Sequence, residues 1–538
     1  MQNEVLKLNI NNKPKKLIMK SVKELFIPFS FVLLAVSAIA QNKNNNKKMN
    51  IVFILADDLG WADVTLYGKT KLYETPNLER LAARGITFNR AYAASPLCSP
   101  TRASILTGQT PARTGITSPA AHQPKVQLKA SRALKAAPNA KSIACKPATR
   151  LNTILPTLGK LLKADGYQTA HFGKWHLGRE PYTPIQHGFD VDIPHWPGPG
   201  PAGSFVAPWK YPKFKANYKN EHIEDRMTDE AINWLRSIDL NEPFYMNYWQ
   251  FSVHAPFDAK ESLIKYYRSK IDFTDLQHSP TYAAMVHSLD QAVGRLLDEI
   301  DRLGISDNTA IVFFSDNGGN MYNGIRETSI TGEEFITEPT SNRPLRGGKA
   351  TIYEGGTRVP CVIVWPKLTN PGSRSDVIIQ STDFYPTILN QLGVKIPKNH
   401  KIDGVDITEA LKGETQDRGP IITYFPHNPK IPNWLPPSVS IHDGDWKLIR
   451  VFHNGKDFKH QYFLYNLKQD IGEVHNLAAK YPEKVKTLDA IIEQHLKDAN
   501  AVVPIANPAF DPQKYHPEDI GISKGGLRVA KRIIHKEK

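Results

Sequence analysis

The sequence predicts an α/β protein with a mostly parallel central sheet flanked by helices, followed by a smaller C-terminal α+β subdomain that carries an antiparallel sheet. The first observation is a pair of continuous apolar runs, at residues 50–56 and 309–314, each with the length of a strand buried on both faces. The second is a helical segment at residues 75–81, closed by Gly85, which precedes another apolar strand at residues 86–88. Buried strands with helical connections are typical of a parallel sheet covered on both faces.

The third observation is a change of pattern after about residue 411. Residues 441–451 contain a turn that leads into a strand, and residues 462–467 form another strand. Residues 481–497 then predict an amphipathic helix. Its apolar side consists of Val485, Leu488, Ile491, Ile492 and Leu496. This segment therefore predicts a small antiparallel sheet with one helix packed against it.

Acidic and amide side chains follow both long apolar runs. Asp57 and Asp58 come directly after the first run, and Asp316 and Asn317 come shortly after the second. In open parallel sheets, ligands bind beyond the carboxyl ends of the strands. Each pair alone is compatible with a loop turn, which Asp, Asn and Gly favour. Because both pairs fall at the same predicted edge, the sequence predicts a shared cation site.

The net charge indicates the class of partner. The 538 residues carry a formal charge of +15, and the first forty contain six Lys and two Glu, so removing them leaves 15 − 4 = +11. A basic protein of this size favours polyanions, namely nucleic acid, anionic lipid or an acidic polysaccharide. Charge alone does not choose between these partners.

The N-terminal segment has the pattern of an export signal. Two lysines precede an apolar run and a cleavage site of small residues at positions 38–40. The run is short for a membrane span, no second hydrophobic segment follows, and no Cys follows it to carry a lipid anchor. We predict cleavage after Ala40 and a periplasmic or secreted protein without a stable membrane anchor; an uncleaved anchor is the alternative. Either Met1 or Met19 is compatible with the start. Export disfavours nucleic acid and favours an extracellular polyanion.

Residues 98–108 are the most informative stretch. Pro100 suits the first turn of a helix, which places Cys98 just ahead of a helix N-terminus. Arg102 lies four residues further on, close enough to reach back toward Cys98. This position favours negative charge on a nucleophile or a bound anion. The alternative from local sequence is an inert Cys with a solvated Arg. Of the other two cysteines, Cys361 lies in an apolar run typical of a buried strand, and whether Cys145 pairs with it stays open.

The sequence C-S-P-T-R at residues 98–102, followed by Leu-Thr-Gly at 106–108, resembles the signature of the type I sulfatases, in which the Cys is converted to formylglycine. Other motifs of that family follow in order over nearly the whole mature chain. They are the Asp pair at 57–58, G-K-W-H-L-G at 173–178, H-A-P-F at 254–257, D-N-G-G at 316–319, L-R-G-G-K at 345–349, Y-E-G-G-T-R-V-P at 353–360, and G-D-W-K-L at 444–448 with L-Y-N-L at 464–467. The resemblance implies an alkaline phosphatase-like fold, with a sulfatase domain at 50–411, the antiparallel-sheet subdomain at 412–505 and a basic tail at 506–538.

The resemblance also implies roles for individual residues. One Ca²⁺ per chain would be bound by oxygen ligands, which a hard cation prefers to the His and Cys ligands of zinc. Formylglycine made from Cys98 by a maturation enzyme would be the nucleophile. His176 would take a proton from its hydrate, and His254 would protonate the leaving oxygen. The implied catalytic set is Cys98, Arg102, Lys174, His176, His254 and Lys349, and the implied metal set is Asp57, Asp58, Cys98, Asp316 and Asn317.

Two basic clusters suggest the substrate class. Residues 117–150 contain seven basic residues and no acidic residue, and residues 209–219 interleave four Lys with aromatic side chains. The alternatives are solvated loops, or a basic rim with aromatic platforms that holds an acidic glycan. With an export signal, a sulfated polysaccharide or its fragments is the favoured substrate. The members are Lys125, Lys129, Arg132, Lys135, Lys141, Lys146 and Arg150 in the first cluster, and Lys210, Lys213, Lys215 and Lys219 with Trp209, Tyr211, Phe214 and Tyr218 in the second.

Two other functions compete with this interpretation. A phosphate-ester hydrolase of the same superfamily usually has Ser or Thr as the nucleophile and two zinc ions, and Cys98 with an all-oxygen site argues against it. A non-catalytic glycan-binding relative would lack at least one site residue, and none is missing. Five further histidines are excluded from the catalytic set: His187, whose motif is interpreted as structural, and His122, His195, His427 and His442. The sugar, the sulfate position, exo or endo action and the oligomeric state are not predicted.

Overall fold

The computed structural model describes residues 47–429, 431, 434–516 and 528–529. The predicted export signal and most of the predicted basic tail lie outside these residues. Among the described helices, none combines the length and the apolar character needed to cross a bilayer. The described residues from Lys48 onward form one compact unit. The structure does not test the predicted division at residues 411 and 412, which stays a prediction.

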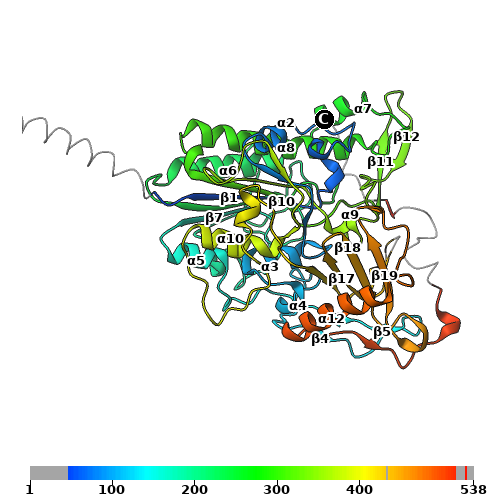
Figure 1. Ribbon diagram of the computed structural model, residues 1–538. Helices are drawn as coiled ribbons and strands as arrows, with labels where there is room; N and C mark the ends of the chain where they lie inside the picture. Colours follow the sequence, from blue (N-terminus) through cyan, green and yellow to red (C-terminus); the bar gives the residue numbers. More distant parts are fainter. Residues whose placement is uncertain (1–46, 430, 432–433, 517–527, 530–538) are drawn as a thin grey trace, which may run out of the picture. The chain divides into compact units, whose positions relative to one another are not determined.

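An eight-stranded sheet forms the centre of this unit, in the order β14-β2-β13-β10-β1-β9-β7-β8 (Figure 1). Within the described part of the sheet, β13 alone runs antiparallel to its neighbours, and the other pairs are parallel. The prediction of a mostly parallel sheet is therefore confirmed. The strands are β1 (Asn50–Ala56), β2 (Ile86–Phe88), β7 (Gln168–Gly173), β8 (Val191–Ile193), β9 (Phe244–Trp249), β10 (Thr309–Ser315), β13 (Cys361–Val364) and β14 (Ser373–Ser375).

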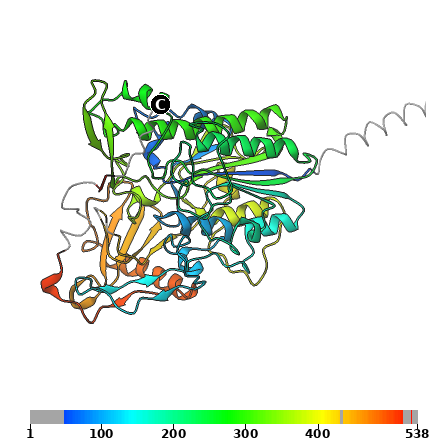
Figure 2. The same ribbon diagram turned by 180° about the vertical axis from the view of Figure 1, so that it is seen from behind.

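Helices cover both faces of the sheet (Figures 1 and 2). Alternate residues of β1 point to opposite faces, so Val52 and Ile54 pack in one core while Ile51, Phe53 and Leu55 pack in the other. This double burial explains why the strand is a continuous apolar run. The first core includes α2 (Pro76–Ala82), α6 (Ile223–Ser237), α7 (Glu261–Arg268) and α8 (Pro280–Arg302), and the second includes α3 (Cys98–Thr107), α5 (Leu158–Ala164) and α10 (Phe384–Gln391).

The strand register brings the motifs to one edge of the sheet. Ala56 at the end of β1 is paired with Ser315 at the end of β10. Trp249 at the end of β9 is paired with Leu55 of β1 and with Gly173 at the end of β7. The chain segments that leave these four parallel strands therefore emerge side by side, although they lie far apart in the sequence.

A second sheet lies towards the C-terminus, and the predicted antiparallel arrangement is confirmed. Its strands run antiparallel in the order β16-β17-β18-β19. One face packs against α12 through the buried Leu488, Ile492 and Leu496. The other face packs against Ile352 and Tyr353, close to the predicted site residue Lys349. The elements are β16 (Ile421–Phe425), β17 (Ser438–Asp443), β18 (Trp446–Val451), β19 (Gln461–Asn466) and α12 (Pro482–Asp498).

Shorter strands and helices lie outside these two sheets, and the short strands form small separate sheets. A hairpin of β11 and β12 extends from the segment after β10, and β20, just after residue 504, pairs with β5. The short strands are β3 (Ala91–Tyr92), β4 (Ser131–Arg132), β5 (Ser142–Ile143), β6 (Cys145–Lys146), β11 (Asn323–Thr328), β12 (Glu334–Thr337), β15 (Ile379–Gln380), β20 (Ile505–Ala506) and β21 (Arg528–Val529). The short helices are α4 (Pro111–Thr114), α9 (Glu354–Thr357) and α11 (Thr408–Leu411).

Candidate active site

The predicted nucleophile is the first residue of helix α3. Cys98 follows the N-cap residue Leu97, and every residue of the helix is buried. The helix N-terminus favours negative charge at this position. Burial nevertheless dominates and raises the pKa of the Cys98 thiol to about 12. The unmodified side chain is therefore a protonated thiol near neutral pH, which is a poor nucleophile.

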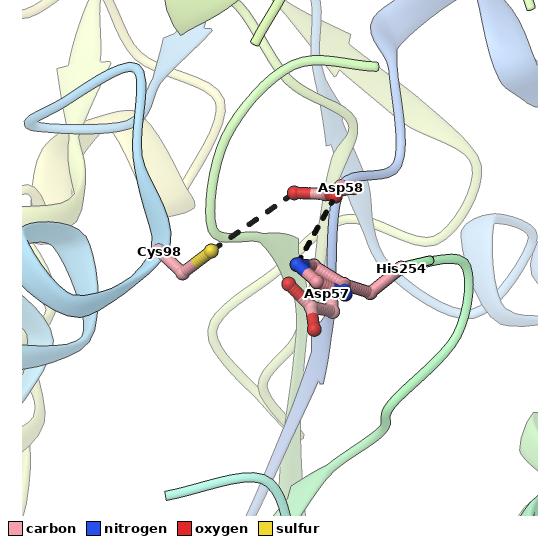
Figure 3. Close-up of side chains that lie close together, drawn as sticks. All are labelled: Asp57, Asp58, Cys98 and His254. Carbon is pink, nitrogen blue, oxygen red and sulfur yellow. Dashed lines mark hydrogen bonds and ion pairs between the residues drawn. The ribbon is translucent and has the colours of Figure 1, made fainter. Parts of the chain in front are cut away.

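Four oxygen-bearing side chains meet beside Cys98. The Sγ atom of Cys98 lies 4.0 Å from Asp58 Oδ1 (Figure 3). Asn317 Nδ2 donates to the same Asp58 oxygen at 2.8 Å, and Asp316 Oδ1 accepts from the Asp58 backbone N–H at 3.2 Å. The candidate ligand atoms of Asp57, Asp58, Cys98 and His254 all lie within 4.8 Å of one another.

Three cations neutralise the three carboxylates, and two of them, Arg102 and Lys174, are fully buried. Lys174 Nζ lies 2.6 Å from Asp57 Oδ2, and Lys349 Nζ lies 2.6 Å from Asp58 Oδ2. Arg102 forms an ion pair with Asp316 at 2.7 Å and donates to the Lys174 carbonyl at 2.6 Å. Burial would raise the pKa of Asp58, but Lys349, His254 and Lys174 hold it well below its ordinary range. The sequence suggested that Arg102 reaches back toward Cys98, but its ion pair is with Asp316 of the metal set.

The residues present fit a hard divalent cation. Two buried oxygens, Asp57 Oδ1 and Asn317 Oδ1, have no hydrogen-bond partner among the described residues. Burial, with Asp316 and Asp58 adding to it, raises the pKa of Asp57 to about 8 despite Lys174. A carboxylate this poorly compensated is stabilised by an additional positive charge. Because the unpartnered atoms are oxygens of a carboxylate and an amide, the donor set suits Ca²⁺.

Two histidines flank the same point. His254 Nε2 lies 3.8 Å from Asp58 Oδ2, and its Nδ1–H donates to the Ala255 carbonyl at 2.5 Å, which leaves Nε2 facing the site (Figure 3). Both ring nitrogens of His176 lack a hydrogen-bond partner among the described residues. Burial first, and then nearby cations, hold the pKa of both histidines well below the ordinary value.

The backbone at two of these residues is strained. Asp58 and His176 have φ angles of 65° and 55°, in the left-handed region that residues other than glycine rarely adopt. Such conformations cost roughly 1–3 kcal/mol and persist where the surroundings determine them. Asp58 follows the end of β1 and His176 follows the end of β7. The left-handed backbone at each residue sets the direction in which its side chain leaves the strand.

Glycines let three loops meet around the site. A Cβ atom on Gly318 would lie 1.8 Å from the Gly355 carbonyl oxygen, and one on Gly355 would lie 2.2 Å from that of Gly347. The D-N-G-G, Y-E-G-G and L-R-G-G-K motifs therefore pack backbone against backbone. This packing carries Lys349 to the carboxylates that follow β1.

A buried charge network, which sequence reasoning missed, supports the loop that carries Lys349. Glu354 accepts from His442 at 2.7 Å and from Tyr92 at 2.9 Å, and Lys447 Nζ lies 3.0 Å from it. Lys447 also forms an ion pair with Glu473 at 2.8 Å, and Glu473 accepts from the Glu354 backbone N–H at 2.7 Å. His442, Lys447 and Glu473 come from the C-terminal region. The only sequence signal was that Glu354 and Lys447 lie in quoted motifs without an assigned role.

Direct contacts thus link nine of the ten predicted site residues to one another. The tenth, His176, is connected to helix α3 through its backbone carbonyl. Ser99 Oγ donates to the His176 carbonyl at 2.7 Å. His122, which we excluded, lies at the same place, because its exposed ring stacks on that of His176 with centroids 5.9 Å apart.

Only some members of the two basic clusters are exposed, as a basic rim requires. Arg150 is fully buried and donates to the carbonyls of Ala120, Gln123 and Thr149, so it is neither a rim residue nor solvated. Tyr211 is buried in the core, which makes its assignment as an aromatic platform wrong. The exposed members are Arg132, Tyr218 and the lysines at positions 125, 129, 135, 146, 210, 213, 215 and 219.

The three cysteines are free thiols in the structure. Cys145 Sγ donates to the Val502 carbonyl at 2.8 Å, and Cys361 lies in β13 as a small apolar residue. The possible Cys145–Cys361 pair is therefore not formed.

Comparison with known proteins decides the family. The profile of the sulfatase family matches residues 49–394. The chain belongs to the sulfatase family. A second profile, the C-terminal region of N-sulphoglucosamine sulphohydrolase, matches residues 348–501, which include the four-stranded sheet and α12.

Two relatives illustrate the similarity of the sulfatase to known sequences. The N-acetylgalactosamine-6-sulfatase of Rattus norvegicus is 33% identical over 397 residues, which cover 70% of this chain and 68% of the relative. A sulfatase of Formosa agariphila is 29% identical over 539 residues, covering 87% and 91%. The sulfatase is therefore a sulfuric ester hydrolase, and its homologues support sulfated sugars as its substrates.

Solved structures agree with this assignment. Ps i-CgsB, in complex with k-i-k-neocarrahexaose, matches with a TM-score of 0.66 and 26% identity, covering 84% of this chain and 93% of that chain. The phosphonate monoester hydrolase of Agrobacterium radiobacter matches with a TM-score of 0.55 at 18% identity, covering 85% and 99%. At this identity, the likeness to a phosphonate monoester hydrolase shows the fold alone.

Proposed function

We propose that the sulfatase removes sulfate from a sulfated polysaccharide, or from oligosaccharides derived from it, with a hydrated formylglycine at position 98 as the nucleophile and Ca²⁺ as its cofactor. The observation that carries this proposal is the clustering of Cys98 with three carboxylates, three cations and two histidines at one sheet edge. A maturation enzyme that oxidises the thiol to an aldehyde would overcome the poor nucleophilicity of the buried thiol. Membership in the sulfatase family supports this modification.

Each group has a defined chemical task. When bound by Asp57, Asp58, Asp316 and Asn317, Ca²⁺ polarises the sulfate oxygens and offsets their charge. Three cations and three carboxylates balance one another, so a divalent ion makes the site positive and attracts an anionic ester. Lys174 and Lys349 lie beside the carboxylates and are suited to bind the sulfate oxygens, and Arg102 is suited to hold Asp316 and the Lys174 backbone in place.

Catalysis proceeds in two steps. One hydroxyl of the aldehyde hydrate gives its proton to the Asp57 carboxylate and attacks sulfur. The bond from sulfur to the sugar oxygen breaks, and His254 gives that oxygen a proton from Nε2. The negative charge of the bound ester favours the protonated imidazole. In the second step, His176 takes the proton of the remaining hydroxyl, the aldehyde re-forms and sulfate leaves. A serine at this position would lack the second hydroxyl and would stay sulfated.

Mass spectrometry tests the proposal directly. The tryptic peptide that ends at Arg102 should be about 18 Da lighter than its thiol form, because an aldehyde replaces CH₂SH. Cys98→Ser should be inactive after one turnover and should carry about 80 Da of added sulfate. Cys145→Ser, whose hydroxyl can still donate to Val502, is the matched control and should keep full activity. Full activity of protein with an intact thiol at position 98 would refute the mechanism.

The family relatives suggest the first substrates to test. Because relatives at 31–33% identity are N-acetylgalactosamine-6-sulfatases, 6-sulfated N-acetylgalactosamine and its oligosaccharides are one starting point. Sulfated galactan oligosaccharides are the second, since the similar Ps i-CgsB binds k-i-k-neocarrahexaose. The export signal predicted for residues 1–40 supports a substrate outside the cytoplasm. Desulfation of neither substrate class would argue against the carbohydrate part of the proposal.

A further inference from the structure

The sheet arranges the site residues in a row that continues past the catalytic groups. In strand order, the segments after β10 and β1 carry the carboxylates, the segment after β9 carries His254, and the segment after β7 carries Lys174 and His176. The next strand is β8, at the end of the sheet. Its carboxyl end lies at the same edge, because β7 and β8 are parallel. Neighbouring strands are about 4.8 Å apart, so this end lies roughly 14 Å from that of β1.

The loop after β8 reaches back to His254. A Cβ atom on Gly200 would lie 2.9 Å from His254 Nδ1 and 2.9 Å from the Ala255 carbonyl oxygen, so the Gly200 backbone packs against the imidazole. Trp196 Nε1–H donates to the Gly200 carbonyl at 2.8 Å. The indole of Trp196 is therefore fixed relative to the histidine that we assign to the leaving oxygen.

Trp196 also lines a cavity of about 240 Å³ at this end of the sheet. The cavity has an apolar wall that includes Trp175, Pro184 and Pro197, and polar side chains that include Arg179 and Asp192. An aromatic and apolar wall with a few polar groups is typical of small-ligand sites. The volume is below the ~300–1,000 Å³ of drug-sized sites, which suits a single sugar ring.

One cation in the wall of the cavity, Arg179, is left free to bind an anionic group. The acidic groups are already engaged, because Asp192 contacts His195 Nδ1 at 2.7 Å and Glu180 accepts from Gln186 at 3.1 Å. Arg179 and Lys213 are exposed, and neither side chain has a hydrogen bond or an ion pair within the described part of the chain. An arginine guanidinium matches the geometry of sulfate and carboxylate groups.

The geometry points to a second sugar subsite in this cavity, in which Trp196 and Arg179 bind a sulfated or carboxylated sugar that neighbours the one losing its sulfate. This inference rests on the proposed function and adds to it the place of the rest of the glycan chain. The sugar oxygen that receives the proton lies at Nε2 of His254, on the other side of the ring from Gly200. The chain attached to that sugar then passes the imidazole towards the loop from Gly200 to Trp196 and enters the cavity.

Chain length is the variable that tests the subsite. The two probe series are chondroitin 6-sulfate and iota-carrageenan oligosaccharides, each compared with its sulfated monosaccharide, and the series that the wild-type enzyme desulfates is used. The wild type should show a higher kcat/KM on tetra- and hexasaccharides than on the monosaccharide. Arg179→Ala should lower kcat/KM on the hexasaccharide about tenfold, through KM, and leave the monosaccharide unchanged, because a charged hydrogen bond contributes about that much. Lys395→Ala, an exposed cation outside both basic clusters that does not line the cavity, should change neither.

A binding measurement separates the subsite from catalysis. In the Cys98→Ala background, which has no nucleophile, Arg179→Ala and Trp196→Phe should each weaken hexasaccharide binding in calorimetry but not monosaccharide binding. If the wild type desulfates sugars without any preference for length, or if Arg179→Ala affects both lengths equally, the subsite is refuted and the proposed function stands. If the wild type neither desulfates nor binds any sulfated sugar, both fail.

Discussion

Replacing Lys447 by Met should destabilise the loop that carries Lys349. The buried charge network around Lys447 determines how much stability is lost. Lys447 has no solvent exposure and lies between the equally buried carboxylates of Glu354 and Glu473, 3.0 Å and 2.8 Å away. Methionine fills a similar volume without a charge. His442 remains as a partner of Glu354, but the Glu473 side chain loses its only ion pair among the described residues.

The expected loss of stability is about 3–5 kcal/mol, the usual cost of leaving a buried charge unpaired. Unfolding entropy is about 2.1 cal/mol/K per residue, so for a folded unit of roughly 450 residues each kcal/mol shifts the melting temperature by about 1 °C. A decrease of about 3–5 °C is therefore expected.

The loss should also depend on pH. Burial, with Glu354 adding to it, raises the pKa of Glu473 to about 7 even in the presence of Lys447. An acid whose folded pKa is raised binds more protons when folded, so its contribution to stability falls as the pH rises from its unfolded value of about 4.3 through the folded value. Without Lys447 this pKa rises further. The variant should therefore be closer to the wild type at pH 6 than at pH 8.

Differential scanning fluorimetry and turnover of a sulfated sugar measure the two consequences. Because Glu473 holds the Glu354 backbone, and this loop carries Lys349, kcat should fall together with stability at a temperature where the protein stays folded. Adding Glu473→Gln to Lys447→Met removes the unpaired carboxylate and should restore part of both. An unchanged melting temperature of Lys447→Met at pH 8 would refute this account of the network. So would a double variant whose loss of stability equals the sum of the losses of the two single variants.

Three further predictions concern the site and its rim. His254→Ala should lose about 10²–10⁴-fold in rate on a sugar sulfate but much less on a nitrophenyl sulfate, whose leaving group needs no proton. His176→Ala should instead accumulate sulfate on residue 98 with both substrates. Equal losses of rate on the two substrates, without that adduct, would contradict the assigned roles. Chelation should abolish turnover, and Ca²⁺ should restore it better than Zn²⁺; a requirement for zinc would revive the phosphatase-like alternative. Neutralising Lys125 and Lys129 together should raise KM on a sulfated oligosaccharide and spare an aryl sulfate, and unchanged kinetics would make them solvated loop residues.

Much of the site was predictable because its chemistry is local in the sequence. The Asp57–Asp58 pair follows an apolar strand, and Cys98 precedes a helix-starting Pro100, so strand ends and helix ends already indicate where charges gather. The mostly parallel sheet followed from two fully apolar runs, because only a strand buried on both faces needs no polar alternation. The resemblance of ordered motifs to the sulfatases supplied the roles.

The neighbours of each charge were not predictable, because they depend on contacts between distant segments. Arg102 was expected to reach back to Cys98 four residues away, yet it pairs with Asp316, more than two hundred positions along the chain. Arg150 was grouped with the basic rim, but three backbone carbonyls hold it in the interior. A sequence pattern records the type of a side chain and its local spacing, and it does not record the partner that decides burial.

The sequence by itself therefore determined the fold class, the antiparallel C-terminal sheet, the family and the residue types of a sulfate-hydrolysing site. Only the tertiary structure decided that the C-terminal region supports Lys349 through Glu354, that His122 stacks on His176, and that the loop after β8 connects His254 with a cavity. The physical reason is that strand pairing sets which loops emerge side by side at the sheet edge. That register depends on packing across the whole core rather than on any one segment.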